Sequence, residues 1–462
     1  MNAMKPVAVA MPESLDEIER VFDRLWPLLR SLTGAGVRAT HDILAELVPL
    51  QRIEVPSGTQ VFDWTVPKEW VVREAYVIAP GGRRILDVAE NNLHLVNYST
   101  PFRGRLSRRE FDAHLHSRPD LPDAIPYVTS YYEPRWGFCL SDRERKALPD
   151  GDYVVVVDTE LVDGSLTISE AVLPGSSKDE VLISTYTCHP SLANNELSGP
   201  LVAAFLYRRL AAWPQRRLTY RFVFAPETIG AIAYLARCGD HLRERMIAGY
   251  VVTCAGLDTH FTYKRSRRGD SLADRTALLA LKQLGADVRV HDFTPTGSDE
   301  RQYCSPGFNL PVGSLMRGAY GDYAEYHTSL DSKSLIAFAA LQGSIDAYEA
   351  ICRTLESAGE RHVIAAEKAA CRTLDADATF QNLFPYGEPQ LGRRGLYPTL
   401  GAADQNRRVE AMMWVLNLSD GKHDLPAISV RSGIPIEALW NAALAAEKKD
   451  VLKRVRAPAK DA

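Results

Sequence analysis

Side chains that can bind a metal ion or transfer a proton gather in four short segments of this chain. The first, 187–200, contains a histidine, two adjacent amides and a carboxylate, and the others lie at 226–230, 297–302 and 325–331. The apolar run 181–186 before the first segment predicts a buried strand. Ligands of an open α/β sheet bind at the carboxyl ends of its strands. We therefore expect the four segments to converge at one edge of a sheet.

Two histidines and one or more carboxylates around an open position form the ligand set of a catalytic zinc ion. His189 and His327 are the candidate histidines. Such an ion lowers the pKa of a water molecule, and a nearby carboxylate outside the ligand set can accept the proton. Glu227 is the candidate base, because it follows one predicted strand and precedes a helix. A carboxylate that only stabilises the start of that helix is the alternative interpretation.

The composition is that of an ordinary globular protein. The chain has 462 residues, of which 46% are hydrophobic and 24% charged, and its net charge is −4. That charge gives no general attraction to nucleic acid or to anionic membranes. No apolar run is long enough to span a bilayer, and we find no signal-peptide pattern. Seven scattered cysteines without paired spacing favour reduced thiols, so we expect a cytoplasmic location.

The pattern along the chain changes several times. Helical spacing marks the N-terminal region, and short alternating strands, including 166–171, mark the next hundred residues. Predicted strands at 181–186, 218–225, 250–254, 288–293 and 310–316 then alternate with helices, which predicts a largely parallel sheet covered on both faces. Three short amphipathic helices, 408–417, 425–432 and 435–448, end the sequence, and the last two have helix-turn-helix spacing. The predicted regions are 1–55 (N-terminal helices of the main domain), 56–175 (inserted β-rich domain), 176–370 (main α/β domain), 371–403 (linker) and 404–462 (winged helix).

The order of these residues resembles that of the M28 zinc aminopeptidases. His189 comes first, followed by Asn195 with Ser198-Gly199, Glu227, Ser298-Asp299 and the late His327. Nearly the whole chain also resembles a bacterial family of aminopeptidase-like proteins, which often accompany polysaccharide or natural-product gene clusters. The matching motifs are 56–70, 91–94, 136–139, 188–200, 226–230, 297–302 and 325–331. The resemblance implies an M28-type mixed α/β sheet, an inserted β-rich domain and a C-terminal winged helix.

The sequence also departs from the M28 pattern. M28 enzymes usually bind two zinc ions that an aspartate bridges, and Asn195 stands at that position. A neutral amide is a poor bridge between two cations. Thr228 replaces a second glutamate that would be a ligand. We therefore expect one zinc ion, held by His189, His327 and Glu196, with Asn195 or Asp299 as alternative ligands.

The resulting prediction is a zinc-dependent hydrolase of an amide bond, most simply an aminopeptidase. A small or peptide-like substrate is expected, and its predicted contacts are Asp299, Glu300, Arg301 and Tyr326. The alternatives are a catalytically degenerate scaffold that binds or regulates, and a transferase that forms amides. The last predicted helix, 435–448, is acidic and alanine-rich, which argues against nucleic-acid binding and favours a protein contact such as homo-oligomerisation.

Overall fold

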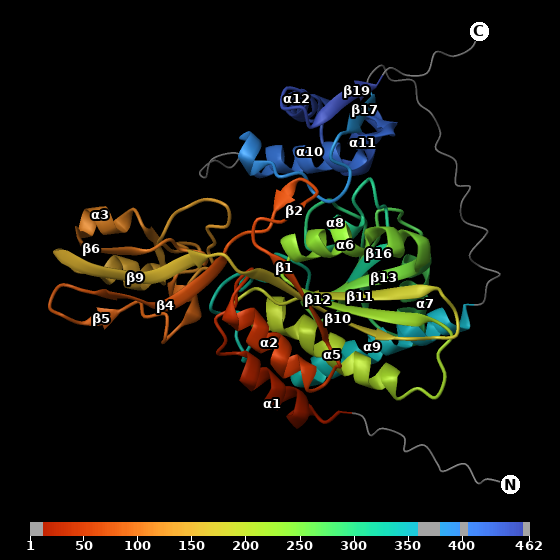
Figure 1. Cartoon of the computed structure of the whole chain (residues 1–462), viewed down its shortest axis with the longest axis horizontal. Helices are drawn as coiled ribbons and strands as arrows, with labels where there is room; N and C mark the ends of the chain where they lie inside the picture. The colour runs from red at the N-terminus through yellow and green to blue at the C-terminus, as the bar shows by residue number, and fades with distance from the viewer. Residues whose placement is uncertain (1–12, 359–378, 398–404, 456–462) are drawn as a thin grey trace.

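A mixed sheet of eight strands forms the centre of the molecule (Figure 1). The computed structural model describes residues 13–358, 379–397 and 405–455. The sheet order is β1-β10-β12-β11-β13-β16-β14-β15, in which the four central strands from β12 to β16 run parallel. The strands are β1 (Gln51–Pro56), β10 (Ser165–Leu173), β11 (Glu180–Tyr186), β12 (Thr219–Ala225), β13 (Met246–Val252), β14 (Phe261–Lys264), β15 (Val288–His291) and β16 (Val312–Arg317).

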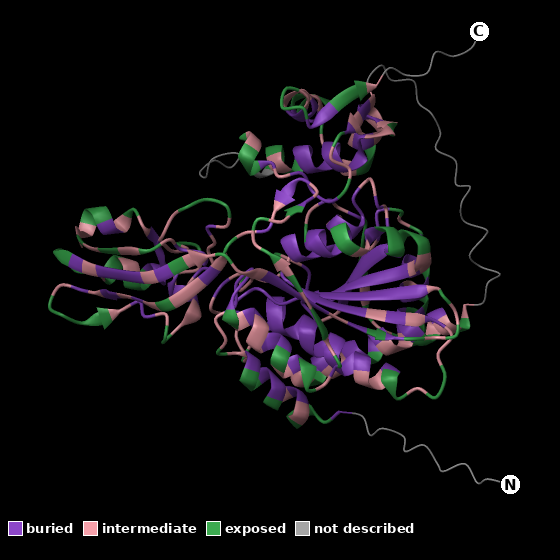
Figure 2. Ribbon diagram, in the orientation of Figure 1, coloured by how far each residue is buried: buried purple, intermediate pink, exposed green. Residues whose placement is uncertain are grey.

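Helices cover both faces of this sheet, which is the arrangement that the alternating pattern predicts. One face carries α1 (Leu15–Leu25), α2 (Ala35–Ala45), α5 (Ser198–Ala211), α7 (Leu272–Gln283) and α9 (Phe338–Ser357), and the other carries α6 (Ile229–Arg245) and α8 (Glu300–Tyr303). All seven residues of β11 are buried, as expected for a strand covered on both sides (Figure 2). Within the described ranges, no helix is long and apolar enough to cross a membrane.

A β-rich module projects from one side of the central sheet. Its antiparallel sheet contains β5 (Arg84–Ile85), β4 (Glu69–Ile78), β9 (Asp152–Val162) and β6 (Phe102–Ser107), in that order. The smaller elements of the module are β7 (Leu115–His116), β8 (Phe138–Cys139), α3 (Arg108–Asp112), α4 (Asp142–Ala147) and η1 (Asn92–His94). The hairpin of β2 (Gln60–Val61) and β3 (Trp64–Thr65) instead lies beside α6 and the C-terminal region. One hydrophobic cluster continues from this module to α6. The module therefore shares a core with the main domain.

One strand lies outside the region in which the sequence pattern places it. The pattern assigns 166–171 to the inserted module, whereas β10 pairs with β1 and β12 in the central sheet. Alternating polarity identifies a strand but not its partner, which explains the difference. The predicted strand 250–254 is found as β13, Met246–Val252, and the short strand β14 is not predicted at all.

The C-terminal region has its own hydrophobic core and the layout of a winged helix. It comprises α10 (Gln405–Leu418), α11 (Leu425–Ser432), α12 (Ile436–Glu447) and a sheet in which β17 (Thr379–Asn382) lies between β18 (Asp420–Asp424) and β19 (Leu452–Val455). The sequence assigns residues 371–403 to a linker, and that prediction is wrong for β17, which is the central strand of this sheet. Several glycine and proline residues follow the four-residue strand β17, and such residues are typical of loops, so the local pattern does not predict a strand there. Residues 371–378 and 398–403 of the predicted linker lie outside the described residues.

Candidate metal centre and active site

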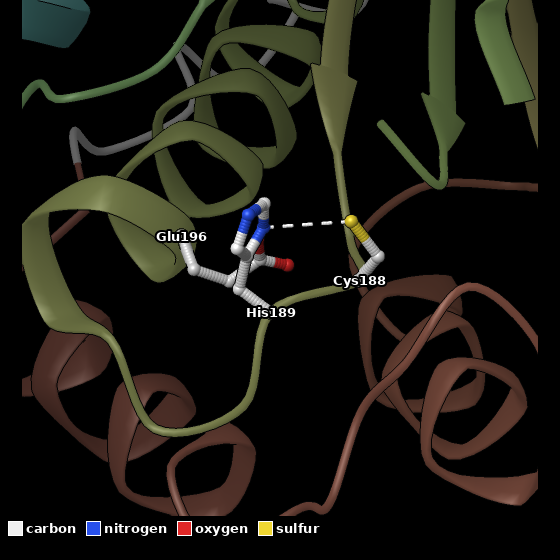
Figure 3. A group of neighbouring side chains, drawn as sticks. All are labelled: Cys188, His189 and Glu196. Atoms are coloured by element: carbon white, nitrogen blue, oxygen red, sulfur yellow. Dashed lines mark hydrogen bonds and ion pairs between the residues drawn. The ribbon is translucent and has the colours of Figure 1, made fainter. Parts of the chain in front are cut away.

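His189 lies just beyond β11, beside two other potential ligands (Figure 3). Its Nδ1 is 2.8 Å from Glu196 Oε2 and 3.4 Å from Cys188 Sγ. One ligand atom from each of these three buried side chains lies within 4.8 Å of the others. A π-helical turn, η2 (Ala193–Leu197), precedes α5 and carries Glu196 back toward the histidine. The predicted pair of His189 and Glu196 is therefore in direct contact.

Arg30 is a buried partner of this pair that the sequence reasoning missed. Its Nε donates to the carbonyl oxygen of His189 at 2.8 Å and lies 3.8 Å from Glu196 Oε1. Its Nη1 donates to the carbonyl oxygen of Leu25 at 2.6 Å, and the side chains of Arg30 and Glu196 are both 0% exposed. Burial raises the pKa of Glu196, although His189 and Arg30 oppose the shift. Burial disfavours protonation of His189, but the hydrogen bond and charge of Glu196 outweigh it, so the histidine pKa is raised.

Glu227 approaches the other ring nitrogen of His189. Its Oε2 lies 3.5 Å from His189 Nε2, and its Oε1 accepts a hydrogen bond from Ser298 Oγ at 2.7 Å. The backbone amide of Glu227 donates to Cys188 Sγ at 3.2 Å. The residue lies between β12 and α6, as the sequence predicts for the candidate base. His189 is thus placed between two carboxylates, one at each nitrogen.

His327 lies on the same side of the molecule as His189, with ring centroids 5.4 Å apart. Its Nε2 is buried and has no hydrogen-bond partner. Burial and then the charge of His189 lower the pKa of His327 to about 3, which keeps the imidazole neutral. Tyr326 stacks on the His327 ring at 4.0 Å, and Tyr127 of the inserted module packs against both histidines. A neutral, unpartnered imidazole nitrogen is available as a ligand.

Asn195 is tied into the protein interior through its amide. Its Nδ2 donates to Tyr186 Oη at 2.9 Å, and its backbone amide donates to Asp331 Oδ2 at 2.9 Å. The Asn195 side-chain oxygen is buried without a partner. Burial raises the pKa of Asp331 to about 6, despite hydrogen bonds from the amides of Asn194 and Asn195. Asp331 therefore supports the turn that contains Asn195.

Asp299, Glu300 and Arg301 are the predicted substrate contacts, and each forms a hydrogen bond or ion pair within the protein. Asp299 Oδ1 accepts a hydrogen bond from the backbone amide of Thr228 at 2.7 Å, and Glu300 Oε1 is 2.7 Å from Lys264 Nζ. The second oxygen of each carboxylate is buried without a partner. Burial, followed by the charge of Glu227, raises the pKa of Asp299 well above its usual range. Arg301 pairs with Glu388, at 2.6 Å, beyond the predicted main domain.

The available donors fit one zinc ion better than two. His189 and His327 supply imidazole nitrogens, which zinc favours, and the free Nε2 of His327 is an unused buried donor. Asn195, which the M28 order of residues in the sequence predicts at the bridging position, is a neutral amide that hydrogen-bonds to Tyr186. A second cation would lack the bridging carboxylate that M28 sites use.

Solved structures with the same fold define the class to which this molecule belongs. A zinc aminopeptidase from Bacillus subtilis aligns with a TM-score of 0.54 at 14% identity and covers 74% of this chain and 94% of its own. A peptidase M28 precursor from Shewanella amazonensis aligns with a TM-score of 0.52 at 13% identity, covering 73% and 91%. The molecule thus has the M28 aminopeptidase fold.

A family model described as "Domain of unknown function (DUF4910)" matches residues 19–358, and one described as "winged helix-turn-helix" matches 378–454. The chain belongs to the DUF4910 family. A protein of Clostridium acetobutylicum is 42% identical over 96% of this chain and 97% of its own; its provisional name is polysaccharide biosynthesis protein with aminopeptidase-like domain. A crystal structure from the same organism, provisionally named a peptidase, has a TM-score of 0.72 at 41% identity and covers 96% of each chain.

Proposed function

We propose that this protein is a metal-dependent hydrolase of an amide bond, with one zinc ion at His189 and His327. The observation that carries the proposal is the placement of His189 between Glu196 and Glu227, with the unpartnered Nε2 of His327 in the same site. The M28 fold and the aminopeptidase-like relative support it. A zinc ion bound there would act as a Lewis acid on the reacting groups.

The chain's own residues would handle the protons of such a reaction. Glu227 Oε2 faces the His189 nitrogen, while Ser298 holds Oε1 at 2.7 Å, so the carboxylate has a fixed orientation. Glu227 would accept a proton from the attacking water and deliver it to the leaving amine. The unpartnered oxygens of Asp299 and Glu300 would receive a cationic amino group of the substrate. The aromatic side chain of Tyr326 is the proposed apolar contact.

Glu196 was predicted as the third ligand, and its geometry supports a different role. A carboxylate at one nitrogen of a metal-binding histidine fixes the ring and leaves the other nitrogen for the ion. Glu196 lies 2.8 Å from Nδ1, whereas Nε2 faces Glu227. We propose that Glu196 orients His189. Replacing it with glutamine should then weaken zinc binding by about 10- to 100-fold, rather than abolish it.

Metal analysis and activity assays test the proposal together. The purified protein is expected to bind about one zinc ion per chain by mass spectrometry, and His189→Ala should remove it. A panel of aminoacyl amides and N-acyl sugars would then be assayed with added zinc. Glu227→Gln should retain zinc but lose turnover by about 100-fold or more. Absence of bound zinc from the purified wild-type protein would refute the proposal.

A second candidate function is that of a binding or regulatory protein built on the M28 fold. Asn195 favours it, because a neutral amide that hydrogen-bonds to Tyr186 stands where the bridging aspartate would be. Zinc binding without hydrolysis of any amide in the panel would support this second function. Formation of amides from acyl donors and amines would instead indicate the transferase.

A further inference from the structure

Thr228, directly after Glu227, has a backbone conformation that threonine rarely adopts. Its φ and ψ are 64° and −77°, and the amide of Ile229 donates to the carbonyl oxygen of Glu227 at 2.8 Å. These features define a γ-turn of the rare, strained type. A β-branched residue with positive φ is an outlier, and such strain persists only where the surrounding structure enforces it. The turn between β12 and α6 therefore needs outside support.

Two residues of the loop 297–302 provide that support. Asp299 Oδ1 accepts the hydrogen bond of the Thr228 amide at 2.7 Å, and Arg301 Nη2 donates to Thr228 Oγ1 at 3.3 Å. One contact fixes the backbone of the turn and the other fixes its side chain. Because Glu227 is the preceding residue, its position depends on the same turn.

Arg301 is held in turn by Glu388, in the segment 383–397 that follows β17. Its Nη1 lies 2.6 Å from Glu388 Oε2. Gln302 bonds both the backbone amide and Oε2 of Glu388, at 2.9 and 3.2 Å, while Tyr397 donates to Oε1 at 2.9 Å. Trp64 Nε1 donates to the Glu388 carbonyl oxygen. A cavity of about 20 Å³ beside Arg301 and Glu388 has room for only about one water molecule.

We propose that Glu388 is a positioning residue for Glu227 and acts through Arg301 and the strained turn at Thr228. The ion pair directs the planar guanidinium toward Thr228 Oγ1, and without it Arg301 would be free to turn away. The turn would then relax toward negative φ and carry Glu227 out of line with His189. Part of the C-terminal region thus supports the candidate active site. The inference rests on the proposed role of Glu227 as the base.

Hydrogen exchange of the turn tests the inference without needing a substrate. In Glu388→Gln, the amides of Thr228 and Ile229 should exchange about tenfold faster, because the support of the turn is weakened. Asp420→Asn is the matched control, since the ion pair of Asp420 with Arg267 also joins the winged helix to the main domain but includes neither Arg301 nor Thr228. Its turn amides should exchange as in the wild type. Unchanged exchange in Glu388→Gln, or equal acceleration in both variants, would overturn the inference.

Substitutions at Thr228 provide a second test that does not require a stable Glu388 variant. Glycine adopts positive φ as readily as negative φ, whereas alanine retains the strain. Both lose the hydroxyl that Arg301 contacts. Thr228→Gly should therefore melt at a higher temperature than Thr228→Ala, although glycine usually lowers stability. The opposite order would show that the turn is not strained and would refute the role of its support.

Kinetics separate this inference from the proposed function. If wild-type protein hydrolyses an amide of the panel, Glu388→Gln should lower kcat about tenfold with little change in KM, since it misplaces the base rather than the substrate. In the Thr228→Gly background, the same substitution should have a smaller effect. A change in KM alone would refute the positioning role. If wild-type protein has no activity but the exchange results hold, the role of Glu227 as the base fails with the proposed function, while the support of the turn by Glu388 stands.

Discussion

Replacing Arg30 with methionine is expected to lower the stability of the main domain strongly. Arg30 and Glu196 both have side chains that are 0% exposed, and Arg30 is the cation nearest to Glu196 Oε1, at 3.8 Å. Methionine fills much of the same volume but leaves the buried carboxylate with only His189 as a partner. Removing one member of a buried ion pair typically costs about 3–5 kcal/mol.

An exposed ion pair in the same N-terminal region, between Arg24 and Glu46, provides the control for this substitution. Arg24 and Glu46 are 2.6 Å apart but 49% and 56% exposed. An exposed pair of this kind contributes little to stability, because water screens both charges. Arg24→Met should therefore change stability several-fold less than Arg30→Met. At about 2 °C per kcal/mol, the buried substitution should lower Tm by about 6–10 °C.

Differential scanning calorimetry would measure the interaction energy between Arg30 and Glu196. It needs four proteins: wild type, Arg30→Met, Glu196→Gln and the double variant. The double variant should lose less than the sum of the two single losses, since it leaves no unpaired charge behind. Equal shifts for Arg30→Met and Arg24→Met would refute the reasoning. So would strict additivity of the two buried substitutions, because the two side chains would then not interact.

Three further predictions concern pH, packing and metal. Burial lowers the pKa of His41 to about 3, whereas the same imidazole in the unfolded chain has a pKa of about 6.5. As the pH falls below 6.5, protonation therefore favours the unfolded chain. The free energy of unfolding keeps this contribution above about pH 6.5 and loses roughly 1.4 kcal/mol of it at pH 5.5. His41→Gln should flatten this part of a plot of unfolding free energy against pH. Gly199→Ala places a Cβ against the carbonyl oxygen of Val252 and should lower stability by roughly 3 kcal/mol in urea unfolding. Zinc at 100 times its Kd should stabilise the wild type by about 2.7 kcal/mol, as a rise in Tm, and His189→Ala should show no rise.

Local patterns predict many of the elements, and the resemblance to the M28 aminopeptidases supplies the type of fold. The helix at 425–432 is found as α11, Leu425–Ser432, because an apolar pattern between an Asp cap and a glycine defines both of its ends. The M28-type sheet covered on both faces and the C-terminal winged helix are confirmed. The pairing of β10 was not predictable, since it depends on contacts between segments far apart in the chain.

Several contacts within the candidate site also join segments that are far apart in the chain, so local patterns do not predict them. The spacing of His189 and Glu196 places them in one loop, but only the π-helical turn shows which histidine nitrogen the carboxylate meets. Arg30 lies 159 residues away from His189 and has no local pattern that marks it as a partner. Arg30 follows Leu28 and Leu29, which is only a weak indication that the arginine is buried. Glu388 lies in a stretch rich in glycine and proline, which resembles a linker, and its contacts with Arg301, Gln302 and Trp64 join segments far apart in the chain.

The order of protein synthesis gives the contact between Arg301 and Glu388 a further consequence. A ribosome adds about 5–20 residues per second, and domains fold as they emerge. All strands of the central sheet precede residue 318, so a nascent chain can build the sheet while residue 388 is still inside the exit tunnel. Such an intermediate contains His189, Glu227 and His327, but nothing yet pairs with Arg301. On the proposed scheme, the hydrolytic centre therefore has a reduced activity beside the ribosome and reaches its full rate only when the C-terminal region has emerged.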